Sequence, residues 1–323
     1  MVFLVPPQPL MSTTLSPHTA HLLGVAFASI YVGSIYVLKT TRLVFTTQPT
    51  KAGPADKPRE RMRAHNERWR DDPDVIKSRI TAVSIATVLC VGIICWIHQS
   101  VPVALAGLGL WPFLPSSLSS IYCTLAPHLV TPLLFLGPLY ASFLSSSSRY
   151  DSLAARTRTL FFNWAGLRNY VVAPITEEIV FRACVLSVYQ LSPKLASSKA
   201  SLVFTTPLNF GLAHLHHAWE TYNRFGRTQA ALKRAILSSV FQMAYTTLFG
   251  AHCAYLFLQT GHSIFVPITA HVFCNIMGFP EFAEDLRTGE SEGRKGRVVS
   301  AYLIGVVGFA YLLMPAGRWL WCA

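Results

Sequence analysis

The stretch APITEEIVFRACVLSVY, residues 173–189, places two adjacent glutamates and an arginine in an otherwise apolar run. An apolar helix needs roughly 20 residues to cross the hydrocarbon core of a bilayer, and this run is close to that length. Charged side chains inside a bilayer are costly, so they usually face a protein interior or a water-filled cavity and serve function. Glu177, Glu178 and Arg182 are therefore the first candidates for a functional site.

The rest of the chain has the composition of a membrane protein. Its 323 residues are 52% hydrophobic and 13% charged, with a mean hydropathy of +0.40, whereas soluble domains carry about 25% charged residues. Continuous apolar runs, which differ from the alternating pattern of barrel strands, occupy residues 21–38, 80–97, 235–258 and 298–314. The sequence predicts an all-α polytopic membrane protein with about eight transmembrane helices around an intramembrane cavity. Besides these runs, we expect the second span to extend over 80–98 and further spans near 101–115, 121–144 and 201–217.

The distribution of charge predicts the topology. The net charge is +12, but the basic residues lie in loops and are not interleaved with aromatic residues, which argues against a nucleic-acid partner. Residues 39–79 contain eleven Lys and Arg and six Asp and Glu, so the positive-inside rule predicts a cytosolic loop. We expect a first span plus this basic loop over residues 1–78, with segment 48–78 mobile or loosely helical, and a membrane core over residues 79–323.

Helical geometry predicts different roles for the two glutamates. Glu178 and Arg182 are four residues apart and can form an ion pair on one helix face. Glu177 points about 100° away and has no partner on its own helix, which suits a general base or acid. A purely structural buried ion network would use the same residue types, and at this point both interpretations remain open.

Two further apolar segments carry polar side chains with helical spacing. NFGLAHLHH, residues 209–217, places Phe210 four residues before His214, and ITAHVFCNIMGF, residues 268–279, places His271 four residues before Asn275. The amide of Asn275 and the ring N–H of His271 can both donate hydrogen bonds from one helix face. A pair of such donors facing a cavity is suited to stabilise an oxyanion.

The three segments have the forms EExxxR, FxxxH and HxxxN, in that order. With RNYVVAPITEEIVFRAC (168–184) and FLGPLY (135–140), they make residues 80–315 resemble the eukaryotic type II CAAX prenyl-protein endopeptidases of the wider CPBP family of intramembrane proteases. The resemblance implies an endoprotease of the endoplasmic reticulum membrane whose active site opens toward the cytosol. Such an enzyme removes the last three residues of farnesylated or geranylgeranylated CAAX proteins, among them Ras-type small GTPases.

The resemblance also implies a role for each motif residue. Glu177 and His214 would activate the attacking water, and His271 and Asn275 would form the oxyanion site. The remaining motif residues would support the site: Glu178, Arg182 and Phe210. No metal and no other cofactor is implied.

Three alternatives use the same polar residues. Glu177, His214 and His271 have the side chains of a His₂Glu zinc site. Cys184 lies two helical turns from Glu177 on roughly the same face and offers a thiol nucleophile, although nothing nearby in the sequence lowers its pKa. From a different class, a transporter or proton-conducting protein would also keep intramembrane Glu, Arg and His residues. A transporter is expected to show repeated halves or paired broken helices, and the sequence has no detectable repeat.

Overall fold

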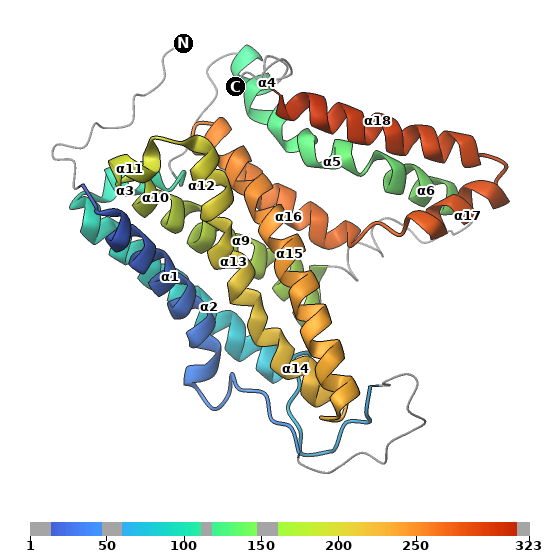
Figure 1. The fold of residues 1–323 in the computed structure, drawn as a ribbon, viewed down its shortest axis with the longest axis horizontal. Coiled ribbons are helices and arrows are strands. Elements are labelled where there is room, and N and C mark those ends of the chain that lie inside the picture. Colours follow the sequence, from blue (N-terminus) through green and yellow to red (C-terminus); the bar gives the residue numbers. More distant parts are fainter. Residues whose placement is uncertain (1–13, 47–59, 111–117, 147–160, 315–323) are drawn as a thin grey trace. The chain divides into compact units, whose positions relative to one another are not determined.

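The computed structural model describes residues 14–46, 60–110, 118–146 and 161–314 (Figure 1). Within these ranges the chain is helical and forms no strand; an isolated bridge joins Val44 to Arg68. The predicted all-α membrane fold is confirmed. The chain divides into two compact units, which are described separately: unit 1 contains Gly109–Pro174 and Leu256–Ala323, together with Met1–Val5, and unit 2 contains Pro6–Leu108 and Ile175–Tyr255.

Unit 2 begins with two long apolar helices, α1 (Pro17–Val37) and α2 (Pro73–His98), which pack side by side (Figure 1). Each has a proline in its first turn, where the missing N–H removes no intrahelical hydrogen bond. The spans expected at 21–38 and 80–98 are thus confirmed. The expected span at 101–115 is present only as α3 (Val101–Gly107); residues 111–115 lie outside the described residues.

The two glutamates lie on one continuous helix, which we call the glutamate helix. Its segments are α8 (Trp164–Leu167), η2 (Arg168–Val172), α9 (Ala173–Glu178), η3 (Ile179–Cys184) and α10 (Val185–Gln190). Both η2 and η3 are π-helical, a geometry that often occurs at functional sites. The sequence predicts regular α-helical geometry here and carries no sign of either π segment.

A series of shorter helices follows the glutamate helix. They are α11 (Pro193–Ala196), α12 (Lys199–Thr205), α13 (Pro207–Ala213), the 3₁₀ turn η4 (His214–His216) and α14 (His217–Arg224). The span expected at 201–217 is therefore divided at Pro207 and at η4, and the polar helix α14 extends it. The next helix, α15 (Gln229–Gln259), is 31 residues long and begins before the apolar run that predicted it.

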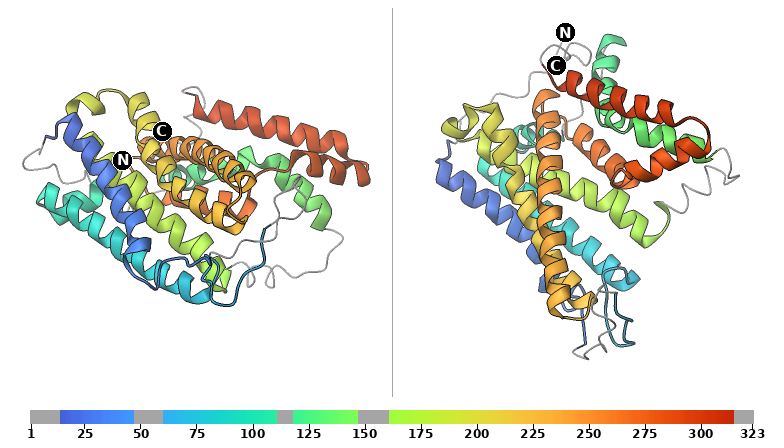
Figure 2. Two further views of the ribbon diagram at one scale, coloured as in Figure 1. Left: turned by 60° about the horizontal axis from the view of Figure 1, so that its bottom comes forward. Right: turned by 45° about the vertical axis from the view of Figure 1, so that its right-hand side comes forward.

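In unit 1, the last helix of the chain packs against two earlier ones. The helix α18 (Lys295–Leu313) lies along α5 (Val130–Leu134) and α6 (Leu136–Ser146), as the views in Figures 1 and 2 agree. This packing is close: a Cβ on Gly305 would be 2.7 Å from the carbonyl oxygen of Leu133, and one on Gly137 would be 2.2 Å from the ring of Tyr302. Glycine at these positions permits the close approach.

Two features of unit 1 differ from the sequence-based expectation. The single span expected at 121–144 is bent by 71° between Tyr122–Leu134 and Leu136–Ser145. It begins with α4 (Leu118–Leu125) and the 3₁₀ helix η1 (Ala126–Leu129), and the prolines in this segment cannot supply backbone N–H groups. Beyond α16 (Phe265–Met277), the polar helix α17 (Phe282–Ser291) has no apolar run and was not expected.

The number of membrane crossings stays partly a prediction. Three of the described helices are long and apolar enough to cross a membrane: α1, α2 and α18. The number rises to four if the bent pair counts as one span, and α16 is a shorter apolar helix. A polytopic membrane protein follows from these helices, whereas the expected total of about eight spans does not.

Candidate active site

The predicted ion pair between Glu178 and Arg182 is present. Arg182 Nε lies 3.0 Å from Glu178 Oε2, and the two side chains are 2% and 0% exposed. The distance is that of an ion pair, but the direction is not that of a hydrogen bond. A buried pair of this kind offsets two charges that would each be costly alone.

Aromatic rings complete the surroundings of Arg182. Its guanidinium carbon lies 4.1 Å from the ring centroid of Phe210 and 5.8 Å from that of Phe249, so the cation faces two π systems. Gly250 leaves the space that this arrangement needs, since a Cβ there would be 2.8 Å from Pro207 Cβ and 3.4 Å from Arg182 Nη2. The phenylalanine of the FxxxH pattern thus contacts the arginine of the EExxxR pattern.

Glu177 lies in a different environment from Glu178. Its side chain is only partly buried, whereas Glu178 is fully buried. The residue before it, Thr176, is 6% exposed, and its hydroxyl hydrogen-bonds the hydroxyl of Tyr31 at 2.8 Å. The helix therefore directs Glu178 into the protein interior and leaves Glu177 partly exposed.

The environment of His214 selects one of its tautomers. His214 Nδ1 lies 2.8 Å from the carbonyl oxygen of Phe210, and because a carbonyl only accepts, Nδ1 carries the proton. Nε2 is then the nitrogen with a lone pair, which is the form a base needs. The ring also packs edge-on against Phe210, with centroids 4.5 Å apart.

His271 and Asn275 lie on α16 in unit 1. His271 is 6% exposed, whereas Asn275 is exposed and donates from Nδ2 to the carbonyl oxygen of Asn169 at 2.9 Å. This bond joins α16 to the π-helical segment η2 and uses one of the two N–H bonds of the amide. Glu177, Glu178, Arg182, Phe210 and His214 lie in unit 2, so the structure brings the seven predicted residues together in two separate groups.

Two of the alternative chemistries can be compared with the structure. Among the described residues, no group of three or more His, Cys, Asp and Glu side chains is arranged to hold a metal ion. The Cys184 side chain is 0% exposed, and a buried thiol of this kind is withheld from a substrate.

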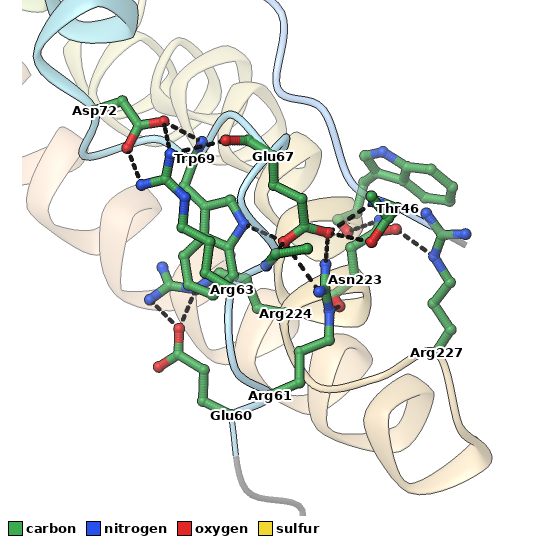
Figure 3. Close-up of polar contacts among 12 residues, drawn as sticks. Thr46, Glu60, Arg61, Arg63, Glu67, Trp69, Asp72, Asn223, Arg224 and Arg227 are labelled. Atoms are coloured by element: carbon green, nitrogen blue, oxygen red, sulfur yellow. Dashed lines mark hydrogen bonds and ion pairs between the residues drawn. The ribbon is translucent and has the colours of Figure 1, made fainter. Parts of the chain in front are cut away.

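A buried carboxylate outside the predicted site anchors the segment after α1 (Figure 3). Glu67 is 2% exposed; its Oε1 accepts from Thr46 N at 2.7 Å and from Arg61 Nη2 at 2.5 Å. Its Oε2 accepts from Arg61 Nη1 and Trp69 Nε1, each at 3.0 Å, and from Ala64 N at 3.2 Å. Segment 48–78 was expected to be mobile or loosely helical. In its described part, residues 60–72 are non-helical and hydrogen-bonded in this network, and residues 73–78 begin α2.

The same segment is bound to the helix that follows His214. Arg61 donates from its backbone N–H to the carbonyl oxygen of Arg224 at 3.0 Å and from Nε to that of Asn223 at 2.8 Å. Arg224 in turn lies 2.5 Å from Glu60 and 3.3 Å from Glu220. Residues 60–72 therefore fix α14, and with it the C-terminal side of the turn that carries His214 (Figure 3).

This network predicts a pH-dependent contribution to stability. Burial alone raises the pKa of Glu67, but hydrogen bonds from Arg61, Thr46 and Ala64 outweigh it and lower the pKa from 4.5 to about 2. A carboxyl group with a depressed pKa stabilises the fold above its unfolded pKa and loses this effect as the pH falls through the folded one. We expect Glu67→Gln to lower the unfolding temperature at pH 7, and the difference from the wild type to shrink between about pH 4.5 and 2.

Thermal unfolding of the purified protein in detergent, recorded at several pH values, measures this difference. Glu290→Gln is the matched control, because it removes an exposed pair with Lys295 that should contribute little to stability. A difference between Glu67→Gln and the wild type that stayed constant down to pH 2 would contradict the prediction.

Comparison with known proteins identifies the family. Residues 159–277 match the family model described as type II CAAX prenyl endopeptidase Rce1-like. The chain is 36% identical to CAAX prenyl protease 2 of Homo sapiens over 301 residues, which cover 90% of this chain and 78% of that protein. The chain belongs to the CAAX prenyl protease 2 family. Every motif residue of the candidate site lies inside the region that the family model matches.

Other members of the CAAX prenyl protease 2 family are similarly related. The protein of Arabidopsis thaliana is 38% identical over 175 residues, covering 54% of this chain and 51% of that protein. The protein of Saccharomyces cerevisiae is 31% identical over 229 residues, covering 65% of this chain and 72% of that protein. No solved structure matches the chain. The transporter alternative is not supported by these relatives.

Proposed function

We propose that this protein is the endoprotease that removes the C-terminal three residues from prenylated CAAX proteins within the membrane of the endoplasmic reticulum. The activity follows from membership of a family whose members are CAAX prenyl proteases. The observation that carries the mechanism is the contrast between the two glutamates: Glu178 is buried against Arg182, while Glu177 is partly exposed. The substrates are farnesylated or geranylgeranylated proteins, among them small GTPases of the Ras type.

The reaction is hydrolysis by activated water, without a covalent intermediate. Glu177, assisted by the Nε2 lone pair of His214, takes a proton from water as the water oxygen attacks the carbonyl carbon of the prenylated cysteine. His271 and Asn275 donate hydrogen bonds to the oxyanion that forms. The C–N bond then breaks, and the proton passes to the leaving amine of the tripeptide. The products are a prenyl-cysteine carboxylate and the free tripeptide.

Glu178, Arg182 and Phe210 have a supporting role in this proposal. Glu178 and Arg182 compensate each other's charge in the interior, so the helix can carry Glu177 without a second net charge beside it. Phe210 contacts both the Arg182 guanidinium and the His214 ring, and its carbonyl fixes the His214 tautomer. Phe210 thereby links the Glu178–Arg182 pair on the glutamate helix to His214.

The site is proposed to open toward the cytosol, where prenylated CAAX proteins are made. Contacts in unit 2 support this orientation: Tyr31, near the end of α1, meets Thr176, while His21, near its start, meets Tyr189. The glutamate helix therefore runs antiparallel to α1, with Glu177 at the end of α1 that leads into the basic loop. The positive-inside rule assigns that loop to the cytosol.

The decisive experiment for the function is a cleavage assay with a farnesylated CAAX peptide and the purified full chain. We expect release of the intact C-terminal tripeptide, no release from the unprenylated peptide, and the same rate with a chelator present. Activity that the chelator abolished and zinc restored would replace the water-activation mechanism with the His₂Glu metal alternative.

The orientation can be measured by labelling cysteines in sealed microsomes with a membrane-impermeant maleimide. Met62 is 93% exposed and Phe162 is 81% exposed, so we expect Met62→Cys and Phe162→Cys to react from the cytosolic face. The exposed His18 lies at the opposite end of α1, and His18→Cys should react only after the membrane is permeabilised. Labelling of Phe162→Cys only from the lumen would remove the substrate's route to the site.

A further inference from the structure

The helix α1 contacts the glutamate helix at Thr176, the residue before Glu177. The hydroxyls of Tyr31 and Thr176 are 2.8 Å apart, and the two residues are 8% and 6% exposed. A buried hydrogen bond of this kind is made at the expense of water, so losing one partner leaves the other hydroxyl desolvated. The turn that carries Glu177 is thus held from outside its own helix.

This turn lies directly before a change in the geometry of the glutamate helix. Glu177 and Glu178 end the α-helical segment α9, and the π-helical segment η3 begins at Ile179. The regular hydrogen-bond pattern of the helix therefore changes immediately after the two glutamates. The tertiary contact with Tyr31 holds the turn just before this change from outside the helix.

The ring of Tyr31 also leads to His214 through a chain of aromatic contacts. Its centroid lies 5.5 Å from that of Phe181 in an edge-to-face arrangement, and Phe181 lies 5.1 Å from Phe210. Phe210 in turn packs against His214 at 4.5 Å. Phe181 and Phe210 are each 2% exposed, so these aromatic side chains pack continuously from α1 to His214.

A second contact fixes α1 along the same helix. His21 Nδ1 lies 2.8 Å from the hydroxyl of Tyr189, more than three turns beyond Thr176. A Cβ on Gly24 would be 3.1 Å from the Tyr189 ring and 3.3 Å from Asn209 Nδ2, which shows how closely the helices approach. The two contacts, more than two turns apart on α1, oppose sliding and rotation of α1 relative to the glutamate helix.

We propose that Tyr31 is a positioning residue for the reaction: its hydroxyl fixes the turn that carries Glu177, and its ring supports the packing behind His214. The expected effect on kcat rests on the proposed function. The proposal extends the functional machinery to α1, which lies outside the region matched by the family model.

The test is Tyr31→Phe in the full chain, which keeps the ring and removes only the hydroxyl. We expect kcat for the farnesylated CAAX peptide to fall by about 10- to 100-fold, as when a reacting group loses its fixed geometry. KM should stay close to the wild-type value because the binding groups are retained, and the unfolding temperature should fall only by what one lost buried hydrogen bond costs. Tyr31→Ala should lower kcat further, since it also removes the support of Phe181.

Tyr189→Phe is the matched control. It removes a hydroxyl that joins the same two helices and also bonds Asn209 on α13, far from Glu177, and it should leave kcat unchanged. Thr176→Val provides the coupling test: if the two hydroxyls act through their shared bond, the double variant Tyr31→Phe/Thr176→Val should be no slower than the slower single variant. Equal kcat losses in Tyr31→Phe and Tyr189→Phe, or additive losses in the double variant, would overturn the proposal.

A second readout is independent of the substrate. Hydrogen exchange measured by mass spectrometry should be faster over residues 173–178 in Tyr31→Phe and unchanged over 185–190, with the opposite pattern in Tyr189→Phe. Unchanged exchange at 173–178 would overturn the inference even if the wild type cleaves the peptide. If the wild type does not cleave, the proposed function fails, and the exchange pattern still decides whether Tyr31 holds this turn.

Discussion

Glu177→Gln is expected to abolish tripeptide release while the protein still accumulates in membranes. The variant keeps the size and hydrogen-bonding shape of the side chain but cannot take a proton from water. General-base catalysis typically contributes about 10²- to 10⁴-fold, so we expect a kcat loss in that range. Because Glu177 is partly exposed and is not the partner of Arg182, the change should have little effect on folding.

The measurement compares initial rates for the farnesylated peptide with the amount of folded protein in the same preparation. His214→Ala should reach a similar residual rate, and the double variant should lose little more, since residues that act as a unit are not additive. Glu178→Gln is the contrasting variant: it alters a glutamate that is 0% exposed and ion-paired, so abundance should fall together with activity. Near-normal turnover by Glu177→Gln would remove the water-activation assignment.

The sequence predicted the ion pair and the different surroundings of the two glutamates for a physical reason. The i,i+4 spacing of Glu178 and Arg182 is set by the backbone of a single helix, so it needs no knowledge of the tertiary structure. The burial of Glu178 and the partial exposure of Glu177 agree with that geometry. The i,i+4 spacing of Phe210 and His214 likewise predicted a contact that is present.

The contacts that escaped prediction join residues that are far apart in the chain. Tyr31 and Thr176 are 145 positions apart, and Arg61 and Asn223 are 162 positions apart. Nothing in either local segment specifies its partner. Glu67 lies in a stretch rich in charge and read as a solvated loop, and only the converging donors of Thr46, Arg61 and Trp69 show that its carboxylate is buried.

The fold was predicted best where apolar runs are long and uninterrupted. The helices α1, α2 and α18 were found from hydropathy alone. The polar helices α14 and α17 were missed because their sequences have no apolar run, and each is stabilised by tertiary contacts: Arg224 of α14 pairs with Glu60, and Asp285 of α17 accepts a hydrogen bond from Tyr302. Hydropathy reports only on the lipid-facing part of such a fold.

Arg182→Ala is expected to fail at an earlier stage than Glu177→Gln. The substitution removes a side chain that is 2% exposed and leaves Glu178 charged and buried without its cation. Breaking a buried pair in this way costs about 3–5 kcal/mol, a large share of the roughly 5–15 kcal/mol that stabilises a typical domain. It also removes the guanidinium that packs against Phe210. We expect low abundance in membranes and a lower unfolding temperature, with activity lost as a consequence.

A double variant separates the loss of charge balance from the loss of the arginine itself. Replacing both partners of a buried ion pair by uncharged side chains is often neutral for stability, so Glu178→Gln/Arg182→Met should regain much of the abundance that Arg182→Ala loses. If the double variant is folded and still cleaves the peptide, the pair is a support for the helix, as proposed. If Arg182→Ala instead remains abundant, well folded and inactive, Arg182 belongs to the group that acts on the substrate, and its ion pair with Glu178 serves to hold it there.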